Sequence, residues 1–217
     1  MSALKERHRQ IRHMQSDALA TRLHRAISWL TRSEAFSDDA DTRFIHLWIA
    51  FNAAYAGEFN EGSEHARSSH FVSRLVAVDT ENLIHQILLS KFSGSVRLLV
   101  DNKYLYAPFW AAMRNHDASD AWKARFKRSK KDAMDAVLCG NAAALMVVVL
   151  DRLHLLRNQL IHGGSTWNGS VNRSQVREAA ELIAHLVPAV IGLMMDSDAF
   201  DDDAIDWPVV PDLPVAG

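Results

Sequence analysis

Residues 155–164, with the sequence LLRNQLIHGG, place polar side chains at the end of an otherwise apolar stretch. On a helix Asn158 and His162 are four apart and share a face, whereas Arg157 diverges from His162 by roughly 140°. The forked guanidinium of Arg157 is suited to holding a phosphate. The negative end of the helix dipole favours an imidazolium at His162, which suits a general acid. We therefore predict catalysis by Arg157 and His162, with Asn158 orienting the imidazole or a bound ligand.

The same residues also fit an ordinary helix end. Gly163 and Gly164 would stop the helix, and the dipole would favour a histidine before them. Arg157 would then pair with Asp151 or another carboxylate. Spacing alone leaves both interpretations open.

A second candidate site is the one dense basic stretch of the chain. Trp122 and Phe126 alternate there with cations, a composition typical of surfaces that follow a phosphate backbone, although a solvated helix face is the common alternative. The predicted RNA-binding residues are Lys123, Arg125, Lys127, Arg128, Lys130 and Lys131.

Other constellations are weaker. Trp48, Asn52 and Tyr55 share a helical face and could stack on a base, but their types favour two core aromatics linked by a buried amide. The pairs His8/His13 and His65/His70 are five apart and lack the spacing of a helical zinc site, so no metal or other cofactor is expected. No serine lies in a Gly-X-Ser-X-Gly elbow.

Composition sets broad limits. The chain has 217 residues, is 48% hydrophobic and has a net charge of -2, which suits a folded domain that attracts RNA only through local patches. Cys139 is the single cysteine, and the N-terminus lacks the apolar core of a signal peptide. The longest apolar run, 142–150, is too short to span a bilayer. We expect a cytoplasmic protein with no membrane association.

Apolar residues recur at helical spacing through most of the chain, which predicts an all-α fold. A long first helix is expected over about 4–30, a second one with aromatic anchors from Phe44 to Gly57, and a loop over 57–67. Further helices are expected over about 71–78, 79–92, 96–100, 108–115, 119–131, 141–162 and 174–195. We assign 1–195 to one helical domain, with 85–140 as a possible inserted subdomain carrying the basic stretch. Residues 196–217 form an acidic tail with prolines.

Two motifs resemble those of the HEPN superfamily (higher eukaryotes and prokaryotes nucleotide-binding). Arg157 and His162 match its Arg-X4-6-His motif, in which a polar residue commonly follows the arginine, as Asn158 does here. Residues 48–55, WIAFNAAY, are similar to the Trp-X-X-Phe-Asn-X-X-Tyr helix of HEPN domains close to the Apea-like group. Both motifs occur in the expected order, so the resemblance covers most of the chain.

The resemblance implies an up-and-down helical bundle, here with extra helices, that forms a homodimer with the two Arg-X4-His motifs facing each other. Active members cleave RNA without metal. His162 would assist the ribose 2′-OH in attacking the phosphate, and Arg157 would stabilise the charge that develops. The protein would then be a toxin or defence effector restrained by a separate antitoxin or regulatory protein. Gly164 stands where a nucleotidylated subgroup has its acceptor tyrosine, so that control is not expected. The alternative is a non-catalytic HEPN module that binds a nucleotide or RNA and dimerises.

Overall fold

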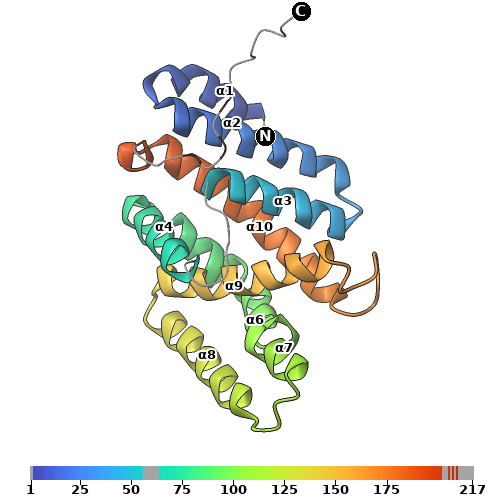
Figure 1. Ribbon diagram of the computed structural model, residues 1–217. Coiled ribbons are helices and arrows are strands. Elements are labelled where there is room, and N and C mark those ends of the chain that lie inside the picture. The colour runs from blue at the N-terminus through green and yellow to red at the C-terminus, as the bar shows by residue number, and fades with distance from the viewer. Residues whose placement is uncertain (1, 56–63, 202–204, 206, 208, 210–217) are drawn as a thin grey trace, which may run out of the picture.

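The computed structural model describes residues 2–55, 64–201, 205, 207 and 209, and these residues fold into helices and turns without a strand (Figure 1). The predicted all-α class is confirmed. The α-helices are α1 (Ser2–Ile11), α2 (Asp17–Ser33), α3 (Ala40–Tyr55), α4 (Glu64–Val78), α5 (Leu83–His85), α6 (Ser93–Val100), α7 (Ala107–Arg114), α8 (Ala121–Leu138), α9 (Ala142–Ile161) and α10 (Arg173–Met195). Short 3-10 turns cover Arg12–Met14, Glu34–Phe36, Lys103–Leu105 and Asp198–Phe200, and a π-helix covers Gln86–Lys91.

Helices α2, α3 and α10 pack most extensively and form the centre of the fold. Figure 1 shows α1 and α2 at one end, α3 and α10 beneath them, and α9 crossing toward the other end. Large side chains are fully enclosed here, among them Leu23, Phe44, Trp48 and Phe51. Each such side chain contributes on the order of 1.5–3 kcal/mol through removal from water. The bundle is therefore the rigid base that positions the remaining helices.

The prediction of a single N-terminal helix over about 4–30 is wrong, because this segment forms two helices, α1 and α2. Ser16 caps α2 by accepting a hydrogen bond from the amide of Leu19 at 3.2 Å. Its hydroxyl also donates to the carbonyl of Asp201 at 2.8 Å. Met14, which falls within the predicted helix, is 69% exposed. The apolar spacing continues across the break and therefore does not reveal it. The break is stabilised by the Ser16 cap and by its hydrogen bond to Asp201.

A buried arginine closes the far end of α3. Arg22, only 1% exposed, donates from Nε and Nη2 to the carbonyl of Ala54 at 3.1 and 2.7 Å. It also reaches the carbonyls of Tyr55 and Phe200, each at 3.4 Å. These bonds occupy helix-end carbonyls that would otherwise lack partners. The predicted stop at Gly57 lies outside the described residues.

Helix α4 begins at Glu64, within the stretch 57–67 that was predicted to be a loop; residues 57–63 lie outside the described part. Helix α4 is thus longer than the predicted 71–78. The helix expected from 79 begins only at Leu83, with Asn82 as its N-cap, although the carboxylate of Asp79 accepts the amides of Leu83 and Ile84, both at 2.8 Å. The segment that follows is a π-helix over Gln86–Lys91 where a regular helix was expected.

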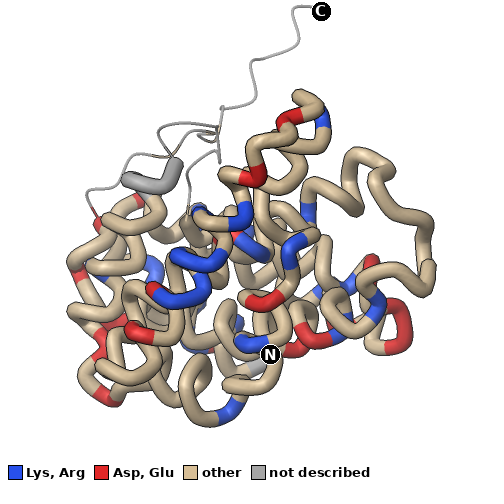
Figure 2. Tube along the Cα trace, turned by 90° about the horizontal axis from the view of Figure 1, so that it is seen from below, with Lys and Arg blue, Asp and Glu red and all other residues tan. Residues whose placement is uncertain are grey.

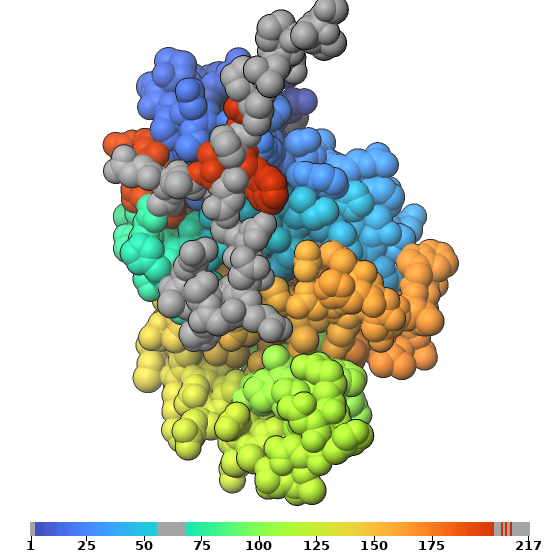
Figure 3. All heavy atoms as spheres, in the orientation of Figure 1, coloured from blue at the N-terminus to red at the C-terminus, as the bar shows by residue number. Residues whose placement is uncertain are grey.

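Helices α7 and α8 form a hairpin with an apolar cluster of its own. Phe109 meets Trp122 edge-on with ring centroids 4.9 Å apart, and Tyr106, Trp110, Ala112 and Phe126 complete the cluster. Figure 3 shows this hairpin, in green and yellow, at the lower end of the molecule. Residues 84–105 and the second half of α8 contribute side chains to the main core instead. The separately packed part is thus about 106–126, narrower than the predicted 85–140.

Helix α10 begins at Arg173 and ends at Met195, as predicted. Its length and apolar composition alone would allow it to cross a membrane, but 61% of its apolar window is buried against other helices. The following residues are not a loose tail at first, because Phe200 is fully buried and Asp201 accepts the Ser16 amide at 2.9 Å. The rest of the predicted acidic tail, apart from 205, 207 and 209, lies outside the described residues.

Candidate functional site

The Arg-X4-His segment lies at the end of α9, and His162 is the residue that caps this helix. The amide of Gly164 donates to the carbonyl of Gln159 at 2.7 Å, and that of Gly163 to Leu160 at 3.4 Å. This is the Schellman arrangement, and it requires the left-handed φ of +69° found at Gly163. The predicted glycine stop is confirmed. It leaves the His162 side chain exposed just beyond the last helical turn.

Arg157 is half-buried and bonded to a neutral group. Its Nη1 donates to Oδ1 of Asn158 at 2.8 Å, while its Nε is enclosed without a partner. Arg157 forms no ion pair with any residue that the structure describes, Asp151 included, so the carboxylate partner required by the helix-end interpretation is missing. A guanidinium held in this way keeps donors and a full charge available for an anion.

Asn158 does not orient His162 through a side-chain hydrogen bond in the described structure. Its Nδ2 lies 2.8 Å from Nε2 of His154, one turn earlier on α9. Because Oδ1 of Asn158 accepts from Arg157, Nδ2 must donate, and His154 must accept on Nε2 and carry its proton on Nδ1. Asn158 therefore positions Arg157, with His154 behind it.

His154 is a site residue that the sequence interpretation missed. Its ring meets Trp48 of α3 edge-on, with centroids 6.0 Å apart. Trp48, His154, Asn158 and Arg157 thus form a continuous chain of contacts between the two motif helices. The available signal was the four-residue spacing of His154 and Asn158, which puts them on one face.

The aromatic residues of α3 are core residues. Trp48 is 1% exposed and Tyr55 8%, so neither offers a face to a base, and the core interpretation holds. Oδ1 of Asn52, one turn after Trp48, is enclosed and has no hydrogen-bond partner among the described residues. Asn52 is therefore a polar group set in the core, on the helix that packs beside α9.

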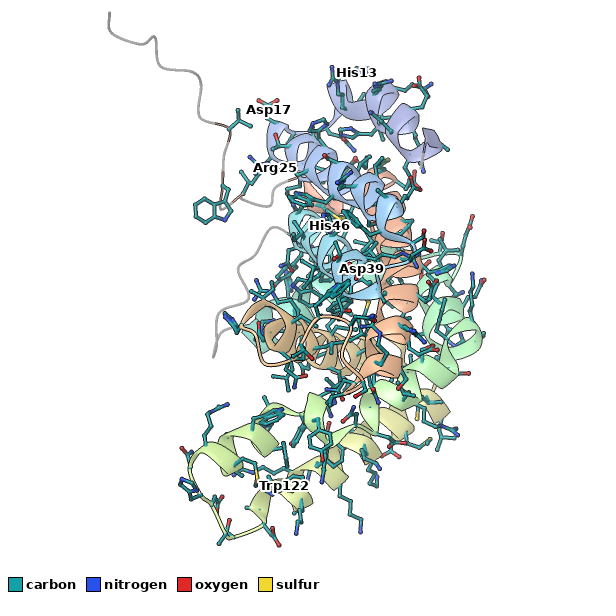
Figure 4. All side chains as sticks on the ribbon, turned by 90° about the vertical axis from the view of Figure 1, so that its right-hand side faces the viewer. His13, Asp17, Arg25, Asp39, His46 and Trp122 are labelled. Carbon is teal, nitrogen blue, oxygen red and sulfur yellow. The ribbon has the colours of Figure 1, made fainter. Side chains whose placement is uncertain are left out.

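The loop after His162 is fastened to the start of α3, where Asp39 is labelled in Figure 4. Trp167 donates from Nε1 to Asp39 at 3.1 Å, and Arg173 forms an ion pair with the buried Asp41. Burial opposes the charge of Asp39, but hydrogen bonds from Thr42 and Trp167 outweigh it and lower the pKa of Asp39. Sequence reasoning missed these anchors, because their partners are more than a hundred positions away.

The basic stretch on α8 divides into two sets. Lys123 pairs with Asp120 at 2.7 Å, Lys130 with Asp101 at 2.8 Å, and Lys131 with Asp135. Over the described residues Arg125, Lys127 and Arg128 have no such carboxylate partner. Figure 2 likewise shows basic and acidic residues intermixed along the Cα trace. Only part of the predicted RNA-binding set is therefore uncompensated.

A groove of about 650 Å³ separates α8 from the first half of α9. Its polar lining includes Arg125, Arg128, Ser129, Asp132, Asn141 and Asp151, with Tyr106 at one side. Burial raises the pKa of Tyr106, while the nearby charges of Arg152 and Arg125 oppose that shift. Two of the three uncompensated cations thus face a shared hollow.

Arg152 lies behind this groove, where it bonds the lining residue Ser129. Sequence analysis did not identify it as a site residue. It is 3% exposed and donates from Nη2 to Oγ of Ser129 at 2.8 Å. Its guanidinium lies over the rings of Tyr106 and Phe126, 4.8 and 6.0 Å from their centroids. Burial lowers the pKa of Arg152, and the charge of Asp151 opposes this. The arrangement joins the α7–α8 hairpin to α9.

Within the described residues, no three His, Cys, Asp or Glu side chains are grouped to hold a metal ion. Comparison of the chain with protein-family models, curated proteins and solved structures found no match.

Proposed function

We propose that the protein is a metal-independent endoribonuclease that uses Arg157 and His162, with Asn158 positioning Arg157. The observation that carries this proposal is the state of Arg157, a half-buried cation bonded to a neutral amide and lacking any carboxylate within the described chain. A half-buried guanidinium beside a neutral amide can accept an anionic ligand such as a phosphate. An exposed histidine at the end of the same helix supplies the proton-transfer group.

In the proposed reaction the 2′ oxygen bonds to phosphorus and the bond from phosphorus to the 5′ oxygen breaks. His162 takes the proton of the 2′-OH, and the imidazolium or water returns one to the leaving 5′ oxygen. Arg157 stabilises the negative charge on the phosphorane-like transition state. The products are a 2′,3′-cyclic phosphate and a 5′-OH, and DNA is not a substrate because it lacks the nucleophile.

We also propose a homodimer with the two motifs near its axis. Apolar side chains are exposed beside His162, namely Ile161 at 46%, Trp167 at 72% and Val171 at 72%. Exposed apolar side chains close in sequence to a polar motif are consistent with a protein interface there. We further propose that the nuclease is a toxin or defence effector and that a separate protein restrains it.

One observation favours the alternative, a non-catalytic module that binds a nucleotide or RNA. The ring of His162 has no hydrogen-bond partner among the described residues that would fix its direction, whereas catalytic imidazoles are commonly oriented by a second group. In that case Arg157 would hold a phosphate that is never cleaved.

The test is incubation of the purified protein with RNA in EDTA, followed by analysis of the product ends. Wild type should yield 2′,3′-cyclic phosphates, and His162→Ala should lower the rate by about 10²–10⁴. The same variant should keep its melting temperature, since a histidine at a helix end contributes about 1 kcal/mol at most. If stability and activity fall together, His162 is structural. RNA binding without cleavage by wild type would favour the non-catalytic module.

A further inference from the structure

The groove between α8 and α9 combines chemical groups that a simple cationic channel would not need. Arg125 and Arg128 present donors and positive charge, but the carboxylates of Asp132 and Asp151 line the same hollow. Among the described lining residues, carboxylates thus stand beside the arginines, and a bare phosphate would meet attraction and repulsion together. A ligand suited to this groove carries both an anion and hydrogen-bond donors.

A nucleotide carries both. Its phosphate matches the forked donors of arginine, and an exocyclic amino group, such as N4 of cytosine, can donate to a carboxylate. Asp132 has no ion pair or hydrogen bond with the described residues, so its oxygens are available. Tyr106 adds an aromatic ring beside Arg125, and a volume of about 650 Å³ falls within the usual range for small-ligand sites.

The groove also lies in line with the candidate catalytic motif. On α9, Asp151, Asn158 and His162 fall within roughly 40° of one another around the helix, so they form one stripe. Asp151 and His162 are separated by roughly 16 Å along the helix axis. An oligonucleotide of a few residues can cover that distance.

We propose that this groove binds a nucleotide of the single-stranded RNA substrate, through Arg125 and Arg128 to the phosphate and Asp132 to an amino-bearing base. This inference rests on the proposed function for the identity of the ligand. It separates the basic residues of α8 into two that contact RNA in the groove, three that are held by carboxylates of the protein itself, and Lys127, which does neither. It also gives the protein a preference for cytosine over uracil at this position.

The experiment measures binding rather than cleavage, with the full chain and 2′-O-methyl oligonucleotides, which cannot undergo 2′-OH attack. Fluorescence anisotropy gives the Kd for labelled oligo(C) and oligo(U) across a range of salt concentrations. The groove variant is Arg125→Gln with Arg128→Gln. The matched control is Lys123→Gln with Lys131→Gln, which removes the same charge from the same helix. Thermal melting verifies each fold, and the single groove variants replace the double one if it melts early.

We expect the groove variant to raise the Kd for oligo(C) about tenfold. Its log-log salt slope should fall by roughly 0.7, the contribution of the one phosphate that the protein no longer neutralises. The control should change the Kd less than about twofold, because its lysines are already paired. Asp132→Asn should narrow the preference for oligo(C).

Equal effects in both double variants would overturn the groove assignment, because the effect would then be general electrostatics. Cleavage by wild type with an unchanged Kd in the groove variant would also overturn it, yet would leave the nuclease intact. Binding through the groove without cleavage would uphold the groove and reject the nuclease. If wild type binds neither oligonucleotide, the groove is not an RNA site.

Discussion

Arg22 and Arg157 show how the surroundings of one side-chain type separate a structural role from a binding role. The guanidinium of Arg22 donates to the carbonyls of Ala54, Tyr55 and Phe200 and is completely enclosed. That of Arg157 donates to one amide oxygen and keeps an unpaired Nε. Donors that are occupied stabilise a fold, and donors left over in a half-buried position are available to a ligand.

This contrast predicts opposite results for the same substitution at the two positions. Arg22→Met keeps the aliphatic stem but leaves buried carbonyls without donors, which should cost about 3 kcal/mol of unfolding free energy and roughly 10 °C of melting temperature. Arg157→Met should melt within about 2 °C of wild type, because little is left unpaired. Calorimetry measures both, and RNA cleavage should be lost in Arg157→Met alone. A large decrease in the stability of Arg157→Met would show that the residue is structural.

His154 should act through Arg157, as a positioning residue. His154→Leu removes the acceptor for Asn158 while keeping a similar volume, so the amide can turn and release Arg157. We expect kcat for RNA cleavage to fall about tenfold, since misplacement of a phosphate-binding group weakens transition-state stabilisation.

His154→Gln is the matched control, because its side-chain oxygen can accept the same hydrogen bond. It should restore most of the activity that His154→Leu removes. Equal activity in the two variants, with unchanged melting, would mean that the hydrogen bond to Asn158 does not position Arg157.

At the scale of helices, α1 is held to the bundle by a buried histidine. His8 is 4% exposed and its Nε2 has no partner among the described residues. Burial lowers the pKa of His8, and the neighbouring charges of His24 and Arg12 lower it further, against a backbone hydrogen bond that raises it. The docked helix therefore requires a neutral imidazole.

The sign of the pH dependence follows from that shift. The unfolded chain binds the proton at its ordinary pKa of about 6.5, whereas the folded protein binds it only at lower pH. The stability due to a neutral His8 is thus complete above about pH 6.5 and is lost as the pH falls toward the folded pKa. Urea unfolding at pH 7.5 and 5.5 should show a smaller decrease for His8→Leu than for wild type. His13→Leu, at an exposed histidine nearby, should behave as wild type.

Sequence patterns predicted the helices whose ends carry local signals. Asn141 and Gly163 are such signals, and each lies where the structure begins or ends a helix. The break between α1 and α2 went unpredicted because apolar spacing continues through it, and Ser16 gains its second partner only from Asp201. Arg157 and His162 could be selected as a pair, but the role of His154 depends on where Trp48 packs. That contact is set by the packing of α3 against α9, which no local pattern encodes.

At the scale of the whole molecule, the proposed dimer predicts how activity divides between subunits. Arg157 and His162 diverge by roughly 140° around α9, which makes it difficult for both to reach one phosphate. We expect Arg157 of one subunit to work with His162 of the other. A mixture of Arg157→Ala and His162→Ala, each inactive alone, should recover roughly a quarter of wild-type cleavage, since half the dimers are mixed and each has one intact site.

Native mass spectrometry of the mixture checks that subunits have exchanged. Mixed dimers without cleavage would place the working pair within one subunit. A monomer at all concentrations would reject the dimer itself.

Hydrogen bonds between distant parts of the chain also determine when, during synthesis, the Arg157 and His162 site can form. Trp167 and Asp39 are 128 positions apart, and Ser16 and Asp201 are 185 apart. Contacts of such long range form late, and α10, which completes the core with α2 and α3, leaves the ribosome after α9. Arg157 and His162 are therefore synthesised before α2, α3 and α10 can form the core that positions them. An enzyme that cuts RNA would in this way stay inactive toward its own message until α10 has joined the core.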